Sequence, residues 1–137
     1  MQTPPINPET KTIVVKNGEG RYQITLTATL TGNGIIAQLL GGEKPHVGGV
    51  VLSVPRPSLT GEGISCDTWI LPVPGHKDVE AARPVAEMIC RVTQQTTVVA
   101  AGIHINQAEN WELEIILNNC LAAAREMIDR SHCPKNH

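Results

Sequence analysis

The chain has 137 residues, of which 41 % are hydrophobic and 18 % charged, a balance that favours one folded domain and excludes a disordered chain. Its net charge is −2 and only 2 % of its residues are aromatic, so it lacks the basic surface and stacking side chains that nucleic-acid binding uses. The sequence shows no apolar run of membrane-spanning length and no secretory signal pattern. We therefore expect a cytoplasmic protein with no nucleic-acid and no membrane partner.

The N-terminal half has the period of β-strands. Residues 1–10 are polar and rich in proline, which predicts a flexible arm. Alternation of apolar and polar residues is clearest over 22–31, so one face of that strand is expected to be buried and the other solvated. Strands are expected over 12–16, 22–31, 35–40, 48–54 and 64–73. The prolines and glycines between these segments indicate turns, as in an antiparallel sheet.

The C-terminal half has the period of helices around one further strand. Apolar residues spaced as on a helix run from Ala82 to Val92, and Pro84 fits best if that helix begins just before it. The β-branched run over 97–103 is typical of a central strand. Asn106 followed by Glu109 resembles a capping box that opens a second helix. The apolar face expected for this helix consists of Leu113, Ile116, Leu117, Cys120, Leu121 and Ala124.

These elements predict an α+β fold. Strands followed by helix, strand and helix favour a two-layer sandwich, with a mainly antiparallel sheet and both helices packed on one face. One ligand-binding domain over 11–131 would hold all of them, followed by a polar tail over 132–137. Cys90 and Cys120 fall on the helical stripes, where free thiols pack as small hydrophobes. The wide spacing of all the cysteines excludes a disulfide framework and a zinc ribbon.

Polar clusters stand at the ends of several expected strands, where a rigid sheet holds exposed side chains. They comprise the segments 44–46, 55–58 and 75–78, together with His104. If the sheet order brings these strand ends together, they form one site. That site would consist of His46, Arg56, Ser58, His76, Lys77 and His104.

Each cluster has two interpretations. The segment 55–58 is either a stiff strand end with a solvated arginine or an anion clamp, in which Arg56 and Ser58 bind phosphate. The segment 75–78 is either a turn that caps a helix or a phosphate site near a helix N-terminus. His104 is either a satisfied histidine or a ligand-binding or proton-transfer residue.

A metal site is a further interpretation. His46, His76 and His104 lie on three different loops, and a catalytic zinc commonly has three protein ligands and one open position. The usual short-range spacings, such as two histidines four residues apart on one helix, are absent from the sequence. A metal-dependent enzyme and a bound cation therefore both stay open.

Three segments together carry a resemblance to a known family. They are GGEKPHVGGVVLSVPRPS (41–58), GHKD (75–78) followed by Ala82-Arg83, and AGIHI (101–105). The chain resembles the prenylated-flavin chaperone family, the small accessory (D-type) subunit associated with UbiD-type gallate and aromatic acid decarboxylases. The resemblance runs from about residue 20 through the final helix.

The resemblance implies a non-catalytic protein rather than an enzyme. Such a protein would bind prenylated flavin mononucleotide (prenylated FMN) as cargo and deliver it to the large subunit of a UbiD-type decarboxylase. The six residues of the expected site would then bind the cofactor, with Arg56, Ser58 and Lys77 holding its phosphate. Glycines Gly48, Gly49 and Gly102 would let the flat ring approach the backbone.

Two further expectations concern partners. The chain is alternatively a structural subunit of a decarboxylase complex, with the polar face of the strand over 22–31 as its interface. A homo-oligomer is also expected, because a small domain can place a pocket between two copies.

Overall fold

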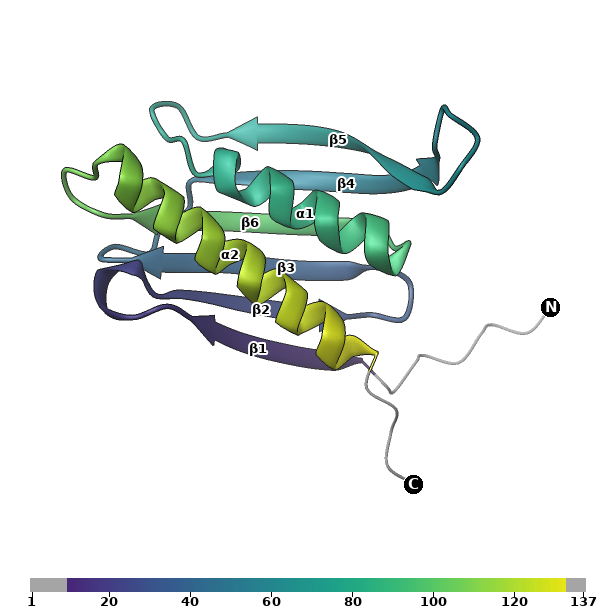
Figure 1. Cartoon of the computed structure of the whole chain (residues 1–137), viewed down its shortest axis with the longest axis horizontal. Coiled ribbons are helices and arrows are strands. Elements are labelled where there is room, and N and C mark those ends of the chain that lie inside the picture. Colours follow the sequence, from purple (N-terminus) through teal and green to yellow (C-terminus); the bar gives the residue numbers. More distant parts are fainter. Residues whose placement is uncertain (1–9, 133–137) are drawn as a thin grey trace, which may run out of the picture.

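The computed structural model describes residues 10–132, so the predicted arm over 1–10 and tail over 132–137 lie almost entirely outside the described residues. Two helices and a sheet make up the fold (Figure 1). The elements in chain order are β1 (Lys11–Asn17), the short 3₁₀ helix η1 (Gly20–Tyr22), β2 (Ile24–Leu30), β3 (Ile35–Gly42), β4 (Gly49–Pro57), β5 (Ile64–Pro72), α1 (Val79–Thr93), β6 (Thr97–His104) and α2 (Asn110–Ser131).

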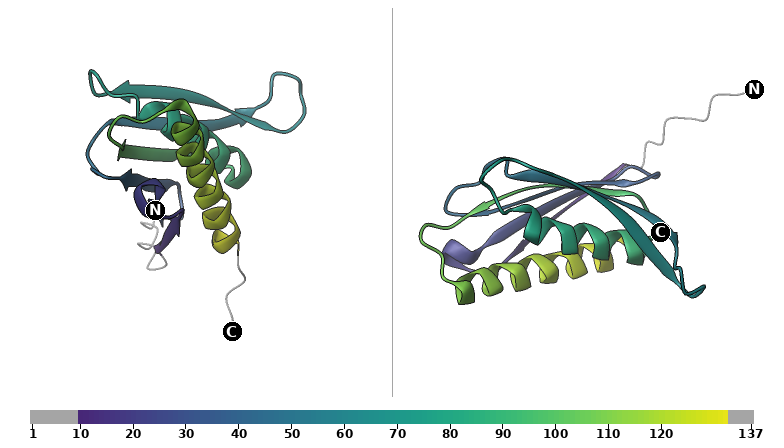
Figure 2. Two further views of the ribbon diagram at one scale, coloured as in Figure 1. Left: turned by 60° about the vertical axis from the view of Figure 1, so that its left-hand side comes forward. Right: turned by 90° about the horizontal axis from the view of Figure 1, so that it is seen from above.

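The six strands form one sheet in the order β1-β2-β3-β6-β4-β5. Neighbouring strands are antiparallel except β3 and β6, which run parallel. Both helices pack on the same face, and the other face has no covering layer of described residues (Figure 2). The predicted α+β fold, with a mainly antiparallel sheet, is confirmed.

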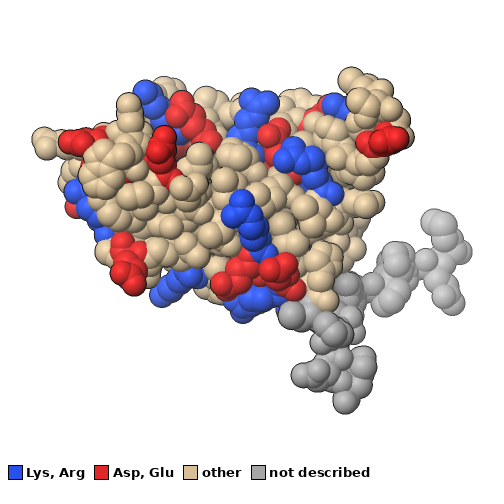
Figure 3. Space-filling model, in the orientation of Figure 1, with Lys and Arg blue, Asp and Glu red and all other residues tan. Residues whose placement is uncertain are grey.

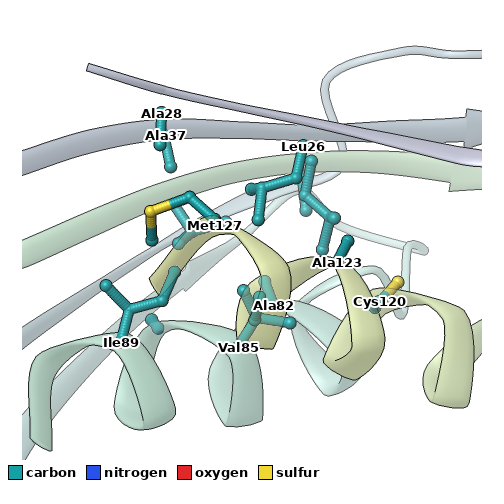
Figure 4. Packing of buried hydrophobic residues seen from close by; sticks show 14 of the residues in the cluster. Leu26, Ala28, Ala37, Ala82, Val85, Ile89, Cys120, Ala123 and Met127 are labelled. Carbon is teal, nitrogen blue, oxygen red and sulfur yellow. The ribbon is translucent and has the colours of Figure 1, made fainter. Parts of the chain in front are cut away.

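The core lies between the sheet and the helices. Apolar side chains of β2 alternate as predicted, with Ile24, Leu26 and Ala28 fully buried and the threonines between them on the uncovered face. Burying one such aliphatic side chain contributes about 1.5–3 kcal/mol. In Figure 4 the two helices and the strands interdigitate through Leu26, Ala28, Ala37, Ala82, Val85, Ile89, Cys120, Ala123 and Met127.

The buried cysteines pack as the sequence predicts. Cys90 and Cys120 are fully buried, and burial raises the pKa of the Cys90 thiol to about 11 and that of Cys120 to about 12. Both thiols therefore stay protonated at neutral pH and behave as small hydrophobes. All cysteines within the described residues are free.

Helix α1 begins earlier than predicted, because it tolerates Pro84 in its interior. The helix starts at Val79, and Pro84 lies in its second turn. Pro84 lacks only the N–H that would pair with the Glu80 carbonyl. The apolar stripe on both sides of the proline, including Ala82 and Val85, is fully buried and holds the helix against the sheet.

Helix α2 begins later than predicted, and its buried face is rotated. Its capping box is formed by Glu109 and Glu112, each of whose side chains accepts a hydrogen bond from the other's backbone N–H. The predicted cap, Asn106, lies in the preceding loop, where its N–H donates to Glu43. As a result Leu113, predicted to be in the core, is 50 % exposed.

Strand β4 continues through the two prolines that were predicted to end it. Its last pair with β6 is Ser53 with Thr97, and beyond Ser53 it pairs with β5 alone. Pro55 and Pro57 therefore occupy the part of β4 where one side needs no ladder hydrogen bond. The prolines mark the end of the central sheet rather than the end of the strand.

The strand directions define two ends of the sheet. Strands β3, β5 and β6 end where β4 begins, at the left of Figure 1. We call this the histidine end, because the loops over 43–48, 73–78 and 105–109 leave the sheet there. The opposite end of β4 and β5 carries the turn over 58–63, and we call it the hairpin end.

Candidate functional site

Two glycines let the loops of the histidine end come together. A side chain at Gly102 would collide with the backbone of His46, whose loop crosses the end of β6. A side chain at Gly48 would collide with the Asp78 carboxylate. The space beside these glycines, and beside Gly49 next to α1, is therefore filled by this chain's own atoms and not available to the flat ring expected there.

His46, His76 and Asp78 form a cluster at the point where the loops meet. Nε2 of His46 lies 3.1 Å from Nδ1 of His76 and 3.2 Å from Oδ2 of Asp78. Nδ1 of His76 lies 3.6 Å from Oδ1 of Asp78. Within the described part of the chain, this is the group of histidine, cysteine and carboxylate side chains whose ligand atoms lie close enough to hold one metal ion.

Asp78 is a site residue that sequence reasoning missed. Its side chain is only 4 % exposed, and its Oδ2 accepts a 2.6 Å hydrogen bond from the Ile103 N–H. One of the two interpretations of the segment 75–78 is a helix cap, but the Asp78 side chain makes no capping hydrogen bond to α1. Its spacing of 32 residues from His46 gave no signal of their contact.

A pocket of about 360 Å³ adjoins the cluster between the N-terminal ends of the two helices. This volume falls in the range of small-molecule sites. One part of its wall is apolar, and Ile103, Leu113 and Leu117 contribute to it. The polar residues that line it are His76, Lys77, Asp78, Glu80, His104 and Glu114.

His104 lies in the pocket but outside the cluster. Its Nε2 is 3.0 Å from Oδ1 of Asn106, and because that amide oxygen only accepts, Nε2 carries the proton. The His104 ring meets the His46 ring edge-on at 6.3 Å between centroids. The predicted trio of histidines is therefore two histidines and an aspartate, with His104 available to a ligand in the pocket.

A polar network fastens the loops that carry these histidines. The Arg21 guanidinium, from η1, donates to the Asn106 carbonyl at 2.7 Å and lies 3.5 Å from Glu112 and 3.8 Å from Glu43. Glu43 accepts the Asn106 N–H at 2.8 Å, and the Tyr22 hydroxyl donates to Glu112 at 2.8 Å. The loops after β3 and β6 are thus tied to α2 and to each other.

The charge state of Glu112 follows from these bonds. The Glu109 backbone N–H, followed by the Tyr22 hydroxyl, lowers the pKa of the Glu112 carboxyl below its ordinary value. The same hydrogen bond raises the pKa of Tyr22, because it holds the phenolic proton. The network is therefore complete when Glu112 is ionised and Tyr22 is neutral.

Arg56 and Ser58 lie at the hairpin end, so the expected convergence of six residues is wrong for these two. Nε of Arg56 pairs with Asp67 across the β4–β5 ladder at 2.7 Å, and Nη1 of Arg56 donates to the Pro57 carbonyl. The Ser58 hydroxyl bonds Thr60 within the turn. The structure brings together His46, His76, Lys77 and His104, because the loops that carry them all leave the sheet at the histidine end.

The uncovered face of the sheet exposes several large apolar side chains. Residues paired directly across neighbouring strands point to the same face, which places Leu52 beside Trp69. The exposed apolar residues on this face are Val14, Ile36, Leu52, Trp69 and Leu71.

The face of the molecule that the helices cover has a mixed charge. On this face, basic and acidic side chains are interspersed rather than segregated (Figure 3). Neither helix in the described residues has the length and apolar run needed to cross a bilayer.

Comparisons with known proteins place the chain in context. The family model described as a prenylated flavin chaperone LpdD-like domain matches residues 18–132, which include all the loops of the histidine end. A comparison with curated protein sequences gives no match. Among solved structures, a chain from the crystal structure of a chaperone complex for yeast 20S proteasome assembly is similar, with a TM-score of 0.56 and 15 % identity over 89 % of this chain and 94 % of that one. At that identity the likeness concerns the fold alone.

Proposed function

Since this chain belongs to the prenylated flavin chaperone LpdD-like family, we propose that it binds prenylated FMN at the histidine end and delivers it to a UbiD-type aromatic acid decarboxylase. The observation that carries the proposal is the pocket in which Lys77, His76 and His104 stand beside an apolar wall. A phosphorylated flavin has the same division, with one charged group and one broad apolar ring.

The pocket suits the two halves of this ligand separately. Lys77 is an exposed donor for a phosphate oxygen, and the exposed His104 can turn its Nε2 proton from Asn106 to the same group. Ile103, Leu113 and Leu117 offer the ring system an apolar surface. The Leu113 side chain is half-exposed, and covering it with the ring would remove apolar surface from water.

Delivery requires that the cargo can leave the pocket. Several polar residues that line the pocket, including Lys77 and His104, are exposed to solvent, which favours release. An enzyme that bound the same flavin for many turnovers would enclose it further. We infer a binding protein that shields the ring and releases it to the decarboxylase large subunit.

The remaining parts of the proposal concern location and assembly. We place the chain in the cytoplasm with its flavin-using partner, and we expect a homo-oligomer. Light scattering coupled to gel filtration measures the number of chains, and a single-chain mass at working concentration would contradict self-association.

An anaerobic titration tests the proposed cargo. We expect reduced prenylated FMN to bind more tightly than plain FMN, with His104→Ala weakening binding about 3- to 10-fold, the value of one lost hydrogen bond. Ser58→Ala, at the hairpin end, is the matched control and should bind as the unmodified chain does. Absence of binding by either flavin would overturn the proposal. Transfer of loaded cargo to an apo-decarboxylase then tests delivery.

A further inference from the structure

The cluster of His46, His76 and Asp78 has the dimensions of a metal site. A tetrahedral zinc ion with ligand bonds of about 2.0–2.1 Å holds its ligand atoms about 3.3–3.4 Å apart. With Oδ1 of Asp78 as the carboxylate ligand, the three separations in the cluster are 3.1, 3.4 and 3.6 Å, and they bracket that value. Two imidazole nitrogens and one carboxylate oxygen are also a ligand set that zinc accepts, with the fourth position open.

The surroundings orient two of the three ligands. Nδ1 of His46 lies 2.8 Å from the Lys44 carbonyl, which can only accept, so Nδ1 carries the proton and the lone pair of Nε2 faces the cluster. The Ile103 N–H donates to Oδ2 of Asp78 at 2.6 Å and so holds the carboxylate by the oxygen other than Oδ1. Hydrogen bonds of this kind, made by the atoms that face away from the ion, are a regular feature of protein metal sites.

The charges around the pocket provide an independent reason for a cation. The pocket is lined by one lysine, Lys77, and by the carboxylates of Asp78, Glu80 and Glu114. A phosphate group with about two negative charges would face these carboxylates as well as Lys77, so an added cation would strengthen its binding. A divalent ion bound to Asp78 and two neutral imidazoles would reverse the sign beside His76, where the cluster borders the pocket.

We propose that His46, His76 and Asp78 bind a divalent transition-metal ion of the zinc class, with its open coordination position turned to the pocket. Resting on the proposed function, we further propose that this position takes a phosphate oxygen of the flavin cargo. The competing interpretation is a hydrogen-bonded cluster of two histidines and an aspartate that holds no ion. The two interpretations differ in whether the chain takes up metal.

Calorimetric titration of the chelator-treated full chain with Zn²⁺ alone tests the site. We expect one ion per chain, and with Co²⁺ the visible absorption of a four-coordinate site. His76→Gln should weaken Zn²⁺ at least about 10-fold, since even residues behind the ligands change affinity by about 10- to 100-fold. His132→Gln, the same change on the exposed histidine that follows α2, is the control and should keep the affinity. Asp78→Asn should weaken Zn²⁺ as well.

The effect of each variant on stability is measured separately, by urea denaturation. His76 is 41 % exposed, so His76→Gln should keep the unfolding transition in urea even if the buried Asp78→Asn does not. Absence of stoichiometric Zn²⁺ uptake by the unmodified chain would overturn the site. Equal Zn²⁺ affinity in a folded His76→Gln chain would overturn it too.

A second titration tests the link to phosphate with plain FMN and riboflavin, which differ by the phosphate group. We expect Zn²⁺ to raise the affinity for FMN at least about 10-fold and to leave riboflavin unchanged, because only the phosphate reaches the ion. Equal effects on both flavins, or none, would overturn the phosphate link. Prenylated FMN binding without any metal uptake would overturn the metal site while the proposed function stands. Metal uptake without flavin binding would overturn the proposed function while the metal site stands.

Discussion

The two ends of the sheet have similar polar residues, but these residues make different contacts. At the hairpin end, Arg56 of β4 bonds Asp67 on the neighbouring strand β5, and Ser58 bonds Thr60 within the turn that joins these two strands. At the histidine end, loops that follow three different strands meet, and His46 contacts a histidine 30 residues away. A polar motif thus gains distant partners where strand order brings several loops together. Its own composition does not decide this.

The glycines of the two ends show the same contrast. Gly102 and Gly48 lie directly against backbone or carboxylate atoms of other loops, whereas Gly61 and Gly63 have open space beside their Cα atoms and positive φ angles. Glycines at the hairpin end therefore serve turn geometry. Those at the histidine end serve close contact between segments.

Gly102→Ala should have the largest effect, because the added methyl group meets the backbone of His46 rather than a flexible side chain. We expect the unfolding free energy to fall by about 1–3 kcal/mol, the usual cost of overpacking. Urea denaturation measures it. Gly61→Ala is the control, with open space but a φ of 83°, and should cost on the order of 1 kcal/mol. A smaller loss at Gly102 than at Gly61 would contradict the packing argument.

Lys77→Ala and Arg56→Ala compare the two ends for binding. We expect Lys77→Ala to weaken FMN about 10- to 100-fold, because a charge-assisted hydrogen bond to phosphate contributes about 1.5–3 kcal/mol. Arg56→Ala should leave the affinity unchanged, since Arg56 is already paired with Asp67 at the other end. Fluorescence titration measures both. Equal weakening by the two variants would place the phosphate site elsewhere.

Acid should loosen the histidine end through Glu112. Its pKa is lowered in the folded chain, so its stabilising effect is complete above the unfolded-state pKa of about 4.3 and is lost as pH falls through the folded value. We expect the unfolding free energy to drop less between neutral pH and pH 3 in Glu112→Gln than in the unmodified chain. Urea titrations at each pH measure this. Identical pH profiles would show that Glu112 is not the group responsible.

Asp67→Asn should have the smallest effect. The Arg56–Asp67 pair lies at the surface, with Asp67 56 % exposed, and such pairs contribute at most about 1 kcal/mol. Urea denaturation at low salt measures the difference. A loss well above 1 kcal/mol would mean that the hairpin end is held more firmly than its exposure indicates.

Local features of the fold followed from local patterns. The alternation around Ile24 and Leu26 and the stripe around Val85 both reflect burial on one side of an element, which the sequence records directly. The helix starts were less accurate. Pro84 was given too much weight, and Glu109, expected as the acidic partner of an Asn106 cap, is itself the cap. Packing against the sheet keeps α1 helical through its proline, and the capping box of Glu109 and Glu112 sets the start of α2.

The sequence by itself determined the element types, the apolar faces, and a set of cationic and imidazole side chains suited to phosphate. Only the tertiary structure decided which of them meet. Placing β6 between β3 and β4 carries His46 over Gly102 and sets His76 and Asp78 beside it, while Arg56 is carried to the opposite end. The physical reason is that strand order and direction depend on burial summed over the whole sheet, which no short motif contains.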